Sequence, residues 1–195
     1  MLVSQILSSK MVPFLYRNRA SVASPCINAF FTHLRSSVTM PIGVVGLSWG
    51  GFYAVQLTYK RMIDGKESPP LVDAGFVASP AQLSVPGDIK DVSAPLGLAV
   101  GTKDMALNMK AIDQIKSLLL DPERPRCHEV VVYEGAKHGE LCTSWLALLF
   151  VHSYVLGFAV RSSPGDKAEK QLGLDAEGQA VDWFRKCFAA RGATA

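Results

Sequence analysis

Hydrophobic residues along this chain alternate between short continuous runs and segments with helical spacing. Four apolar runs stand at residues 41–46 (PIGVVG), 74–78 (AGFVA), 95–100 (PLGLAV) and 129–133 (EVVVY). Runs of this kind are typical of buried strands in a parallel sheet. Apolar residues recur at helical spacing in four other segments, at residues 24–37, 50–63, 108–120 and 175–190. The alternation predicts βαβ units, and therefore an α/β fold with a mainly parallel sheet.

The first predicted helix has recognisable start signals. Ser24 is a candidate N-cap, and Pro25 suits the first turn of a helix over residues 24–37. Because function in open parallel sheets gathers at the carboxyl ends of strands, the polar residues there are of most interest. Ser48, Asp104 and His138 each follow a predicted strand.

The first of these residues lies in the pattern Gly46-x-Ser48-x-Gly50, which is typical of a nucleophile elbow. We expect small residues at both ends of the pattern, because the turn from strand to helix is sharp. The helix that follows directs its N–H groups and its positive dipole end at the site. The N–H of Trp49 is then a candidate oxyanion donor.

A serine nucleophile needs a base, and the base needs a carboxylate to orient it. Asp104 and His138 follow Ser48 in the order found in α/β hydrolases. Each has an alternative when taken singly: Asp104 as a cap of the helix at 108–120, and His138 as a polar loop residue. Taken together, the three predict a triad with Ser48 as nucleophile, His138 as base and Asp104 as orienting carboxylate.

Composition narrows the function classes. The 195 residues suit one domain, and a net charge of +3 without a basic run gives no indication of nucleic-acid binding. The four cysteines form neither CxxC nor zinc-ligand spacing, so we expect reduced thiols, no metal or organic cofactor, and a cytoplasmic protein. No acidic residue precedes Asp64. An N-terminal segment without acidic residues resembles a mitochondrial transit peptide, although we favour an ordinary basic helical segment.

Several stretches resemble the dienelactone hydrolase family of the α/β-hydrolase superfamily. They are GLSWGGFYAV, APLGLAVGTKD, EVVVYEGAKHG, FAVR and QAVDWFRKCF, and the resemblance runs from about residue 11 to residue 188. It implies a three-layer α/β-hydrolase-type fold, a small ester or lactone substrate, and a triad at Ser48, Asp104 and His138. It also implies that Arg161 binds a substrate carboxylate, which would favour an anionic substrate. A surface role for Arg161 is the alternative.

Two departures from that family concern residue types and the length of the N-terminal part. Ser48 stands where the family usually has cysteine, and Ser79 where we expect histidine. Only about forty residues precede the first predicted strand, so we expect early strands and one oxyanion donor to be missing. The whole chain, 1–195, is then a single but partial hydrolase domain.

A third departure is the apolar insertion Glu140–Gly157, which separates AKHG from FAVR. It is eighteen codons long and can be read as a retained intron, because Gly139-Glu140 and Leu156-Gly157 permit splice signals in frame. A lid over the site is the alternative. Residues 141–160 are also apolar enough for a membrane anchor, but we expect no span directly behind His138.

The sequence therefore predicts an ester or lactone hydrolase that acts through an acyl-enzyme. Three alternatives stay open: an inactive hydrolase fragment, a membrane-tethered protein, and a serine hydrolase of another α/β family. The oligomeric state is open as well.

Overall fold

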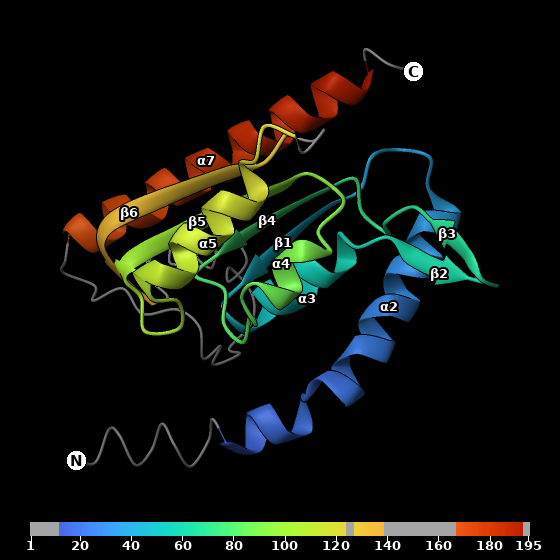
Figure 1. The fold of residues 1–195 in the computed structure, drawn as a ribbon, viewed down its shortest axis with the longest axis horizontal. Coiled ribbons are helices and arrows are strands. Elements are labelled where there is room, and N and C mark those ends of the chain that lie inside the picture. Colours follow the sequence, from blue (N-terminus) through green and yellow to red (C-terminus); the bar gives the residue numbers. More distant parts are fainter. Residues whose placement is uncertain (1–11, 124–126, 139–166, 193–195) are drawn as a thin grey trace, which may run out of the picture. The chain divides into compact units, whose positions relative to one another are not determined.

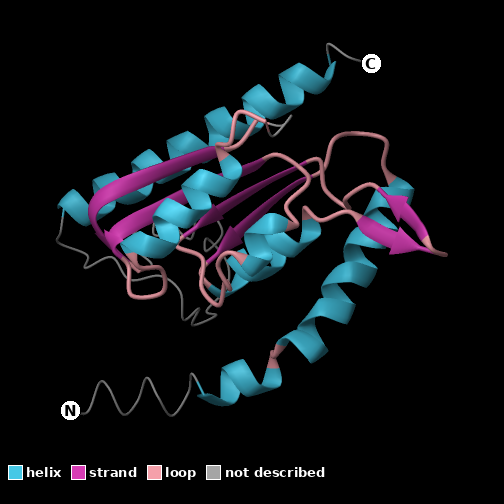
Figure 2. Cartoon of the chain, in the orientation of Figure 1, coloured by secondary structure: helices cyan, strands magenta, loops and turns pink. Residues whose placement is uncertain are grey.

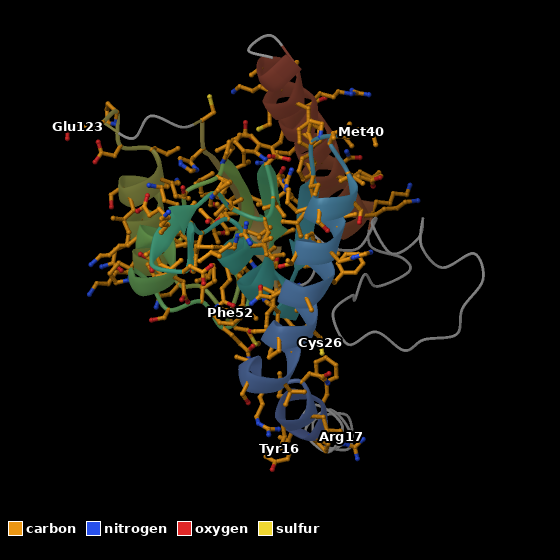
Figure 3. All side chains as sticks on the ribbon, turned by 90° about the vertical axis from the view of Figure 1, so that its right-hand side faces the viewer. Tyr16, Arg17, Cys26, Met40, Phe52 and Glu123 are labelled. Atoms are coloured by element: carbon orange, nitrogen blue, oxygen red, sulfur yellow. The ribbon has the colours of Figure 1, made fainter. Side chains whose placement is uncertain are left out.

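A computed structural model describes residues 12–123, 127–138 and 167–192. The chain divides into two compact units, Met1–Thr39 and Met40–Ala195. In the first unit, residues 12–17 are helical and are followed by helix α2, Ala20–Ser37, which has no buried residue. Figure 3 marks Tyr16 and Arg17 on the first of these segments and Cys26 on the second.

The start of α2 differs from the prediction. Its N-cap is Arg19, which makes no side-chain capping hydrogen bond, so Ser24 is not the cap. Pro25 lies inside the helix and not in its first turn. A proline there removes one backbone hydrogen bond. The helix nevertheless begins at Ala20, a residue type with high helix propensity.

The second unit contains a four-stranded sheet in the order β1-β4-β5-β6, with every neighbouring pair parallel (Figure 2). Its strands are β1 Gly43–Leu47, β4 Ala74–Ala78, β5 Leu96–Lys103 and β6 Glu129–Lys137. Its helices are α3 Trp49–Leu57, α4 Gly87–Lys90, α5 Met109–Leu119 and α7 Lys167–Gly192. All four predicted strands are confirmed, and β5 and β6 extend beyond their apolar runs.

Helices cover both faces of this sheet (Figure 1). On one face, residues of α3, α4 and α5 pack with alternate strand residues; the cluster includes Val55, Ile89, Ile112, Val77, Leu98 and Val100. On the other face, α7 packs on the remaining alternate positions; that cluster includes Ala176, Ala180, Trp183, Phe76, Ala78 and Ala99. The predicted three-layer α/β fold with a mainly parallel sheet is confirmed.

The predicted helix over residues 50–63 is wrong beyond Leu57. Arg61–Ile63 (β2) instead pairs with Lys66–Ser68 (β3) in a short antiparallel hairpin. Its two-residue turn is Asp64-Gly65, with φ of 50° and 74°. Positive φ at both central positions is the requirement of a type I′ turn, and Asp-Gly is a preferred sequence for it. That dipeptide was the signal that could have ended the helix prediction.

Side chains satisfy backbone groups at the end of the sheet where the strands begin, which we call the amino edge. The N–H of Ile42 donates to Asp73 Oδ2 at 2.7 Å, and the N–H of Leu96 donates to His128 Nδ1 at 3.2 Å. The indole N–H of Trp183 donates to the carbonyl of Gly75 at 3.0 Å, and this bond is buried. The hydrogen bond of Trp183 therefore links α7 to the sheet at this end.

None of the helices in the described ranges combines the length and the apolar character that crossing a membrane requires. The segment 141–160, the candidate anchor, lies outside those ranges.

Candidate active site

Ser48 connects β1 to α3 in an unusual backbone conformation. Its φ is 47° and its ψ is −112°, outside the regions that L residues normally occupy. Such a conformation costs on the order of 1–3 kcal/mol and persists only where the surroundings enforce it. The side chain lies at the end of the sheet opposite the amino edge, which we call the carboxyl edge. The geometry there is that of the predicted elbow.

Two glycines allow this elbow to pack, but one of them is not the predicted one. A Cβ on Gly46 would lie 2.5 Å from Ala54 Cβ and 2.6 Å from the carbonyl oxygen of Gly50. A Cβ on Gly51 would lie 2.7 Å from Pro80 Cβ. A Cβ on Gly50, in contrast, would meet no described atom within 4 Å. The expectation of close packing is met at Gly46 but not at Gly50. Gly51 is instead the residue of α3 that packs against Pro80, in the segment after β4.

Ser48, His138 and Asp104 form a continuous hydrogen-bonded chain. Ser48 Oγ is 2.8 Å from His138 Nε2, and His138 Nδ1 is 2.8 Å from Asp104 Oδ1. A carboxylate can only accept, so Nδ1 is the donor to Asp104. In a neutral imidazole the other nitrogen is then an acceptor, and the Ser48 hydroxyl donates to it. The serine proton thus already points at a base.

The two partners of Ser48 differ in burial. The side chain of His138 is 24% exposed and that of Asp104 is 1% exposed. Asp104 Oδ1 also accepts from the N–H of Ala106 at 2.8 Å, whereas Oδ2 is buried and has no partner among the described residues. Asp104 is not the N-cap of α5; Asn108 is, and its side chain accepts from the N–H of Ala111.

A bulge in β6 brings His138 level with Asp104. Partner numbers on β5 and β6 differ by 32 up to the pair Gly101↔Tyr133, but by 34 at the pair Lys103↔Lys137. Two additional residues of β6 are therefore taken up opposite Thr102. Asp104 directly follows Lys103, and His138 directly follows Lys137. The bulge thus sets the two side chains next to each other.

Local contacts fix the bulge. Thr102 Oγ1 accepts from the N–H of Gly135 at 2.8 Å and donates to Glu134 Oε1 at 3.2 Å. Gly135 has a φ of 76°, a conformation that favours glycine. A Cβ on Gly101 would lie 2.2 Å from the carbonyl oxygen of Ala136, so the strands approach closely here. We did not predict this bulge, although a Gly at 135 inside a strand pattern is a signal for one.

Aromatic side chains surround the start of α3. The Trp49 and Tyr53 rings are 4.6 Å apart between centroids, and the Phe52 and Tyr53 rings are 5.1 Å apart. Burial raises the pKa of Tyr53, so its hydroxyl stays protonated well above neutral pH. Trp49 is the first residue of α3, so its backbone N–H lies at the helix end that carries the positive dipole.

Two of the predicted features lie outside the described residues: Arg161 and the insertion Glu140–Gly157. Within the described ranges, no three His, Cys, Asp or Glu side chains gather as a metal site would require.

Comparison with known proteins gives structural matches only. No protein-family model matches the chain, and no curated protein matches it in sequence. An α/β-hydrolase enzyme from a Medee basin deep-sea metagenome library matches with a TM-score of 0.52 and 15% identity, over 82% of this chain and 62% of that one. A puromycin hydrolase matches with a TM-score of 0.51 and 14% identity, over 83% of this chain and 24% of that one. A Klebsiella pneumoniae protein described as a dienelactone hydrolase matches with a TM-score of 0.49 and 16% identity, over 73% of this chain and 51% of that one.

The first two of these likenesses, together with the layers and the parallel sheet, establish the fold. The second unit has an α/β-hydrolase fold. The chain spans about half to three fifths of the length of the first solved structures that it matches, such as 51%, 52% and 62%.

Proposed function

We propose that this chain is a serine hydrolase of carboxylic esters or lactones. The single observation that carries the proposal is the hydrogen-bonded chain Ser48–His138–Asp104, with both contacts at 2.8 Å. Two further features support it: the left-handed elbow at Ser48, and the burial of Asp104 behind the imidazole. In this arrangement the nucleophile, the base and the orienting carboxylate touch in the required order.

The reaction follows from the direction of the hydrogen bonds. Ser48 Oγ attacks the carbonyl carbon while its proton passes to His138 Nε2, and Asp104 stabilises the imidazolium through Nδ1–H. The N–H of Trp49 and the dipole of α3 stabilise the negative oxygen of the tetrahedral intermediate. His138 then gives its proton to the leaving alkoxide as the C–O bond breaks. Water, deprotonated by His138, attacks the acyl-enzyme and releases the acid and Ser48.

The substrate class rests on the resemblance to the dienelactone hydrolase family, to which we propose that this chain belongs. Arg161 is then the group that binds a substrate carboxylate. Arg161→Ala should raise KM for anionic esters and leave KM for neutral esters unchanged. Arg185→Ala, on the exposed face of α7, is the matched control, since it removes the same charge elsewhere. Equal effects on anionic and neutral esters would remove this assignment.

Labelling with a fluorophosphonate tests the proposed function directly. Ser48 Oγ forms a bond to phosphorus, fluoride leaves, and the serine proton passes to His138. We expect wild type to label, and Ser48→Ala to lose all labelling at an unchanged melting temperature. Ser117→Ala, which removes an exposed hydroxyl from α5, is the control and should label as wild type does. A folded wild-type chain that does not label would contradict the proposal.

A further inference from the structure

The main chain of Ser48 is held by residues that lie outside the Gly-x-Ser-x-Gly pattern. The N–H of Ser48 donates to the carbonyl of Ala78 at 3.1 Å. Its carbonyl accepts from the N–H of Ala81 at 2.9 Å and from the N–H of Gly51 at 3.0 Å. The last bond belongs to the start of α3. The other two come from residues 78–81, the last residue of β4 and the turn that follows it, which we call the β4 turn.

The β4 turn has an unusual conformation of its own. Ser79 has a φ of 45° and is fully buried, and its N–H donates to the carbonyl of Ala99 on β5 at 2.9 Å. Its hydroxyl has no hydrogen-bond partner among the residues that the structure describes. The left-handed residue reverses the chain, so that the carbonyl of Ala78 and the N–H of Ala81 both reach Ser48. An unbranched side chain tolerates this region better than a β-branched one.

The turn also packs directly on α3. A Cβ on Gly51 would lie 2.7 Å from Pro80 Cβ and 2.9 Å from Pro80 Cα. The turn therefore approaches the helix to a distance that only glycine at residue 51 permits. Hydrogen bonds on one side and this contact on the other leave the turn little freedom to move relative to Ser48.

We propose that the β4 turn is a positioning element for the nucleophile. Its carbonyl at Ala78 and its N–H at Ala81 hold Ser48 in the left-handed conformation that keeps Oγ 2.8 Å from His138 Nε2. The inference rests on the proposed function. The element acts on Ser48 through these two main-chain hydrogen bonds. Without these hydrogen bonds, Ser48 would adopt other conformations in which Oγ is too far from His138 Nε2 to transfer its proton.

Removal of one hydrogen bond is the first test. Ala81→Pro deletes the N–H that donates to Ser48. Ser84→Pro is the matched control, because it deletes an N–H three residues further along that donates to Asp88 Oδ2 instead. Fluorophosphonate labelling is measured over a range of probe concentrations, below each variant's melting temperature. We expect Ala81→Pro to lower the maximal labelling rate by about 10- to 100-fold, the cost of an ångström-scale misplacement, with the half-saturating probe concentration unchanged.

Displacement of the turn is the second test, and it does not depend on the tolerance for proline. Gly51→Ala pushes Pro80 away from α3. Gly178→Ala, on α7, adds the same methyl group where nothing lies within 4 Å. Gly51→Ala should again lower the maximal rate and leave probe saturation unchanged, whereas Gly178→Ala should label as wild type does.

The outcomes separate the two proposals. If wild type labels and both turn variants, when folded, label at the wild-type rate, the positioning role is overturned and the proposed function stands. If wild type does not label, both are overturned. A turn variant that raises the half-saturating probe concentration at an unchanged maximal rate would also overturn the inference, because the turn would then act on binding.

Discussion

The two ends of the parallel sheet differ in how well their polar groups are hydrogen-bonded. At the amino edge, Asp73, His128 and Trp183 each satisfy a backbone group near the start of a strand. At the carboxyl edge, Ser48 and Ser79 have positive φ. Two buried oxygens there, Ser79 Oγ and Asp104 Oδ2, have no partner among the described residues. Backbone strain and unsatisfied polar groups tend to gather at functional sites, and their cost is borne by the rest of the fold.

From this comparison we expect the amino edge to contribute mainly to stability and the carboxyl edge mainly to the proposed activity. The comparison makes opposite predictions for substitutions at the two ends, because activity should depend on the carboxyl edge and unfolding free energy on the amino edge. Each prediction below separates these two quantities by measuring both on the same variant.

The largest expected effect is on activity at the carboxyl edge. Asp104→Asn should lower kcat by about 10⁴-fold, because the amide no longer fixes the tautomer of His138. Asp113→Asn, on the exposed side of α5, is the control. Ester hydrolysis and urea unfolding are measured for both. The comparison breaks if Asp104→Asn destabilises the fold more than it impairs catalysis.

The next effect is on stability at the amino edge. Trp183→Ala should lower the unfolding free energy by about 3–5 kcal/mol, because it removes a large buried side chain. Trp183→Phe keeps a ring and removes the N–H that donates to Gly75, so it should cost about 1–3 kcal/mol. Where folded, both variants should keep the wild-type rate of fluorophosphonate labelling. A labelling defect in folded Trp183→Phe would mean that the two ends are coupled.

The two glycines of β1 compare the ends within one strand. Gly46→Ala should cost about 1–3 kcal/mol of stability, because its methyl would meet main-chain atoms of α3 that have no room to shift. Gly43→Ala should cost less, because its nearest neighbours are the ring atoms of Phe184 and Phe188. Urea unfolding measures both. Equal costs would show that the elbow is no more tightly packed than the amino edge.

Two buried hydroxyls give a smaller and sharper contrast. Thr58 Oγ1 donates to the carbonyl of Val55 at 2.6 Å, whereas Ser79 Oγ has no described partner. Thr58→Val should therefore cost about 1 kcal/mol, the usual net value of a hydrogen bond. Ser79→Ala should cost nothing or stabilise the protein. A destabilising Ser79→Ala would mean that its hydroxyl does have a partner.

The smallest effect concerns a thiol on α7. Burial raises the pKa of Cys187 to about 11, so its thiol stays neutral at pH 8. With about a thousandth of it ionised there, alkylation by iodoacetamide should be slow and should rise about tenfold per pH unit up to about pH 11. Exposed Cys26 and Cys127 should react faster. Peptide mass spectrometry reads each site, and comparable rates at pH 8 would contradict the burial of Cys187.

The same shift has a sign for stability. The pKa of Cys187 is higher in the folded chain than the ordinary thiol value of about 8.5, so folding favours the protonated form. Its contribution is complete below about pH 8.5 and is lost as the pH rises toward about 11. Stability should therefore decline across that window, and less so in Cys187→Ala.

Much of the fold could be predicted from apolar runs, because strands buried on both faces have to be continuous hydrophobic segments. The runs at 74–78 and 129–133 correspond to β4 and to the first half of β6. The extensions of β5 and β6 escaped prediction, because residues such as Thr102 and Glu134 are polar and lie at the bulge. The hairpin at 61–68 was missed because helical spacing continues through Met62 and Ile63.

The site divides in the same manner. Ser48, Asp104 and His138 could be predicted because they follow predicted strands, lie in the chain order of a hydrolase triad and include a Gly-x-Ser-x-Gly pattern. The role of residues 78–81 could not, because it depends on two backbone hydrogen bonds and a left-handed φ at Ser79. The residue types of a candidate site can be seen in the sequence. Main-chain hydrogen bonds between distant segments cannot, because they depend on the order and register of the strands in the sheet.

The bulge in β6 also changes which face of the sheet the side chains around it occupy. Side chains on a regular strand alternate between two faces, but Tyr133 and Ala136 both pack in the cluster on the α7 face although they are three residues apart. The bulge takes up two additional residues opposite Thr102, so that Lys137 pairs with Lys103 and His138 follows beside Asp104. Deletion of two residues at 134–136 would restore regular pairing along the whole of β6 and would leave Lys137 opposite Lys103. The place of His138 beside Asp104 is thus fixed by the pairing of Lys137 with Lys103, which precedes it directly.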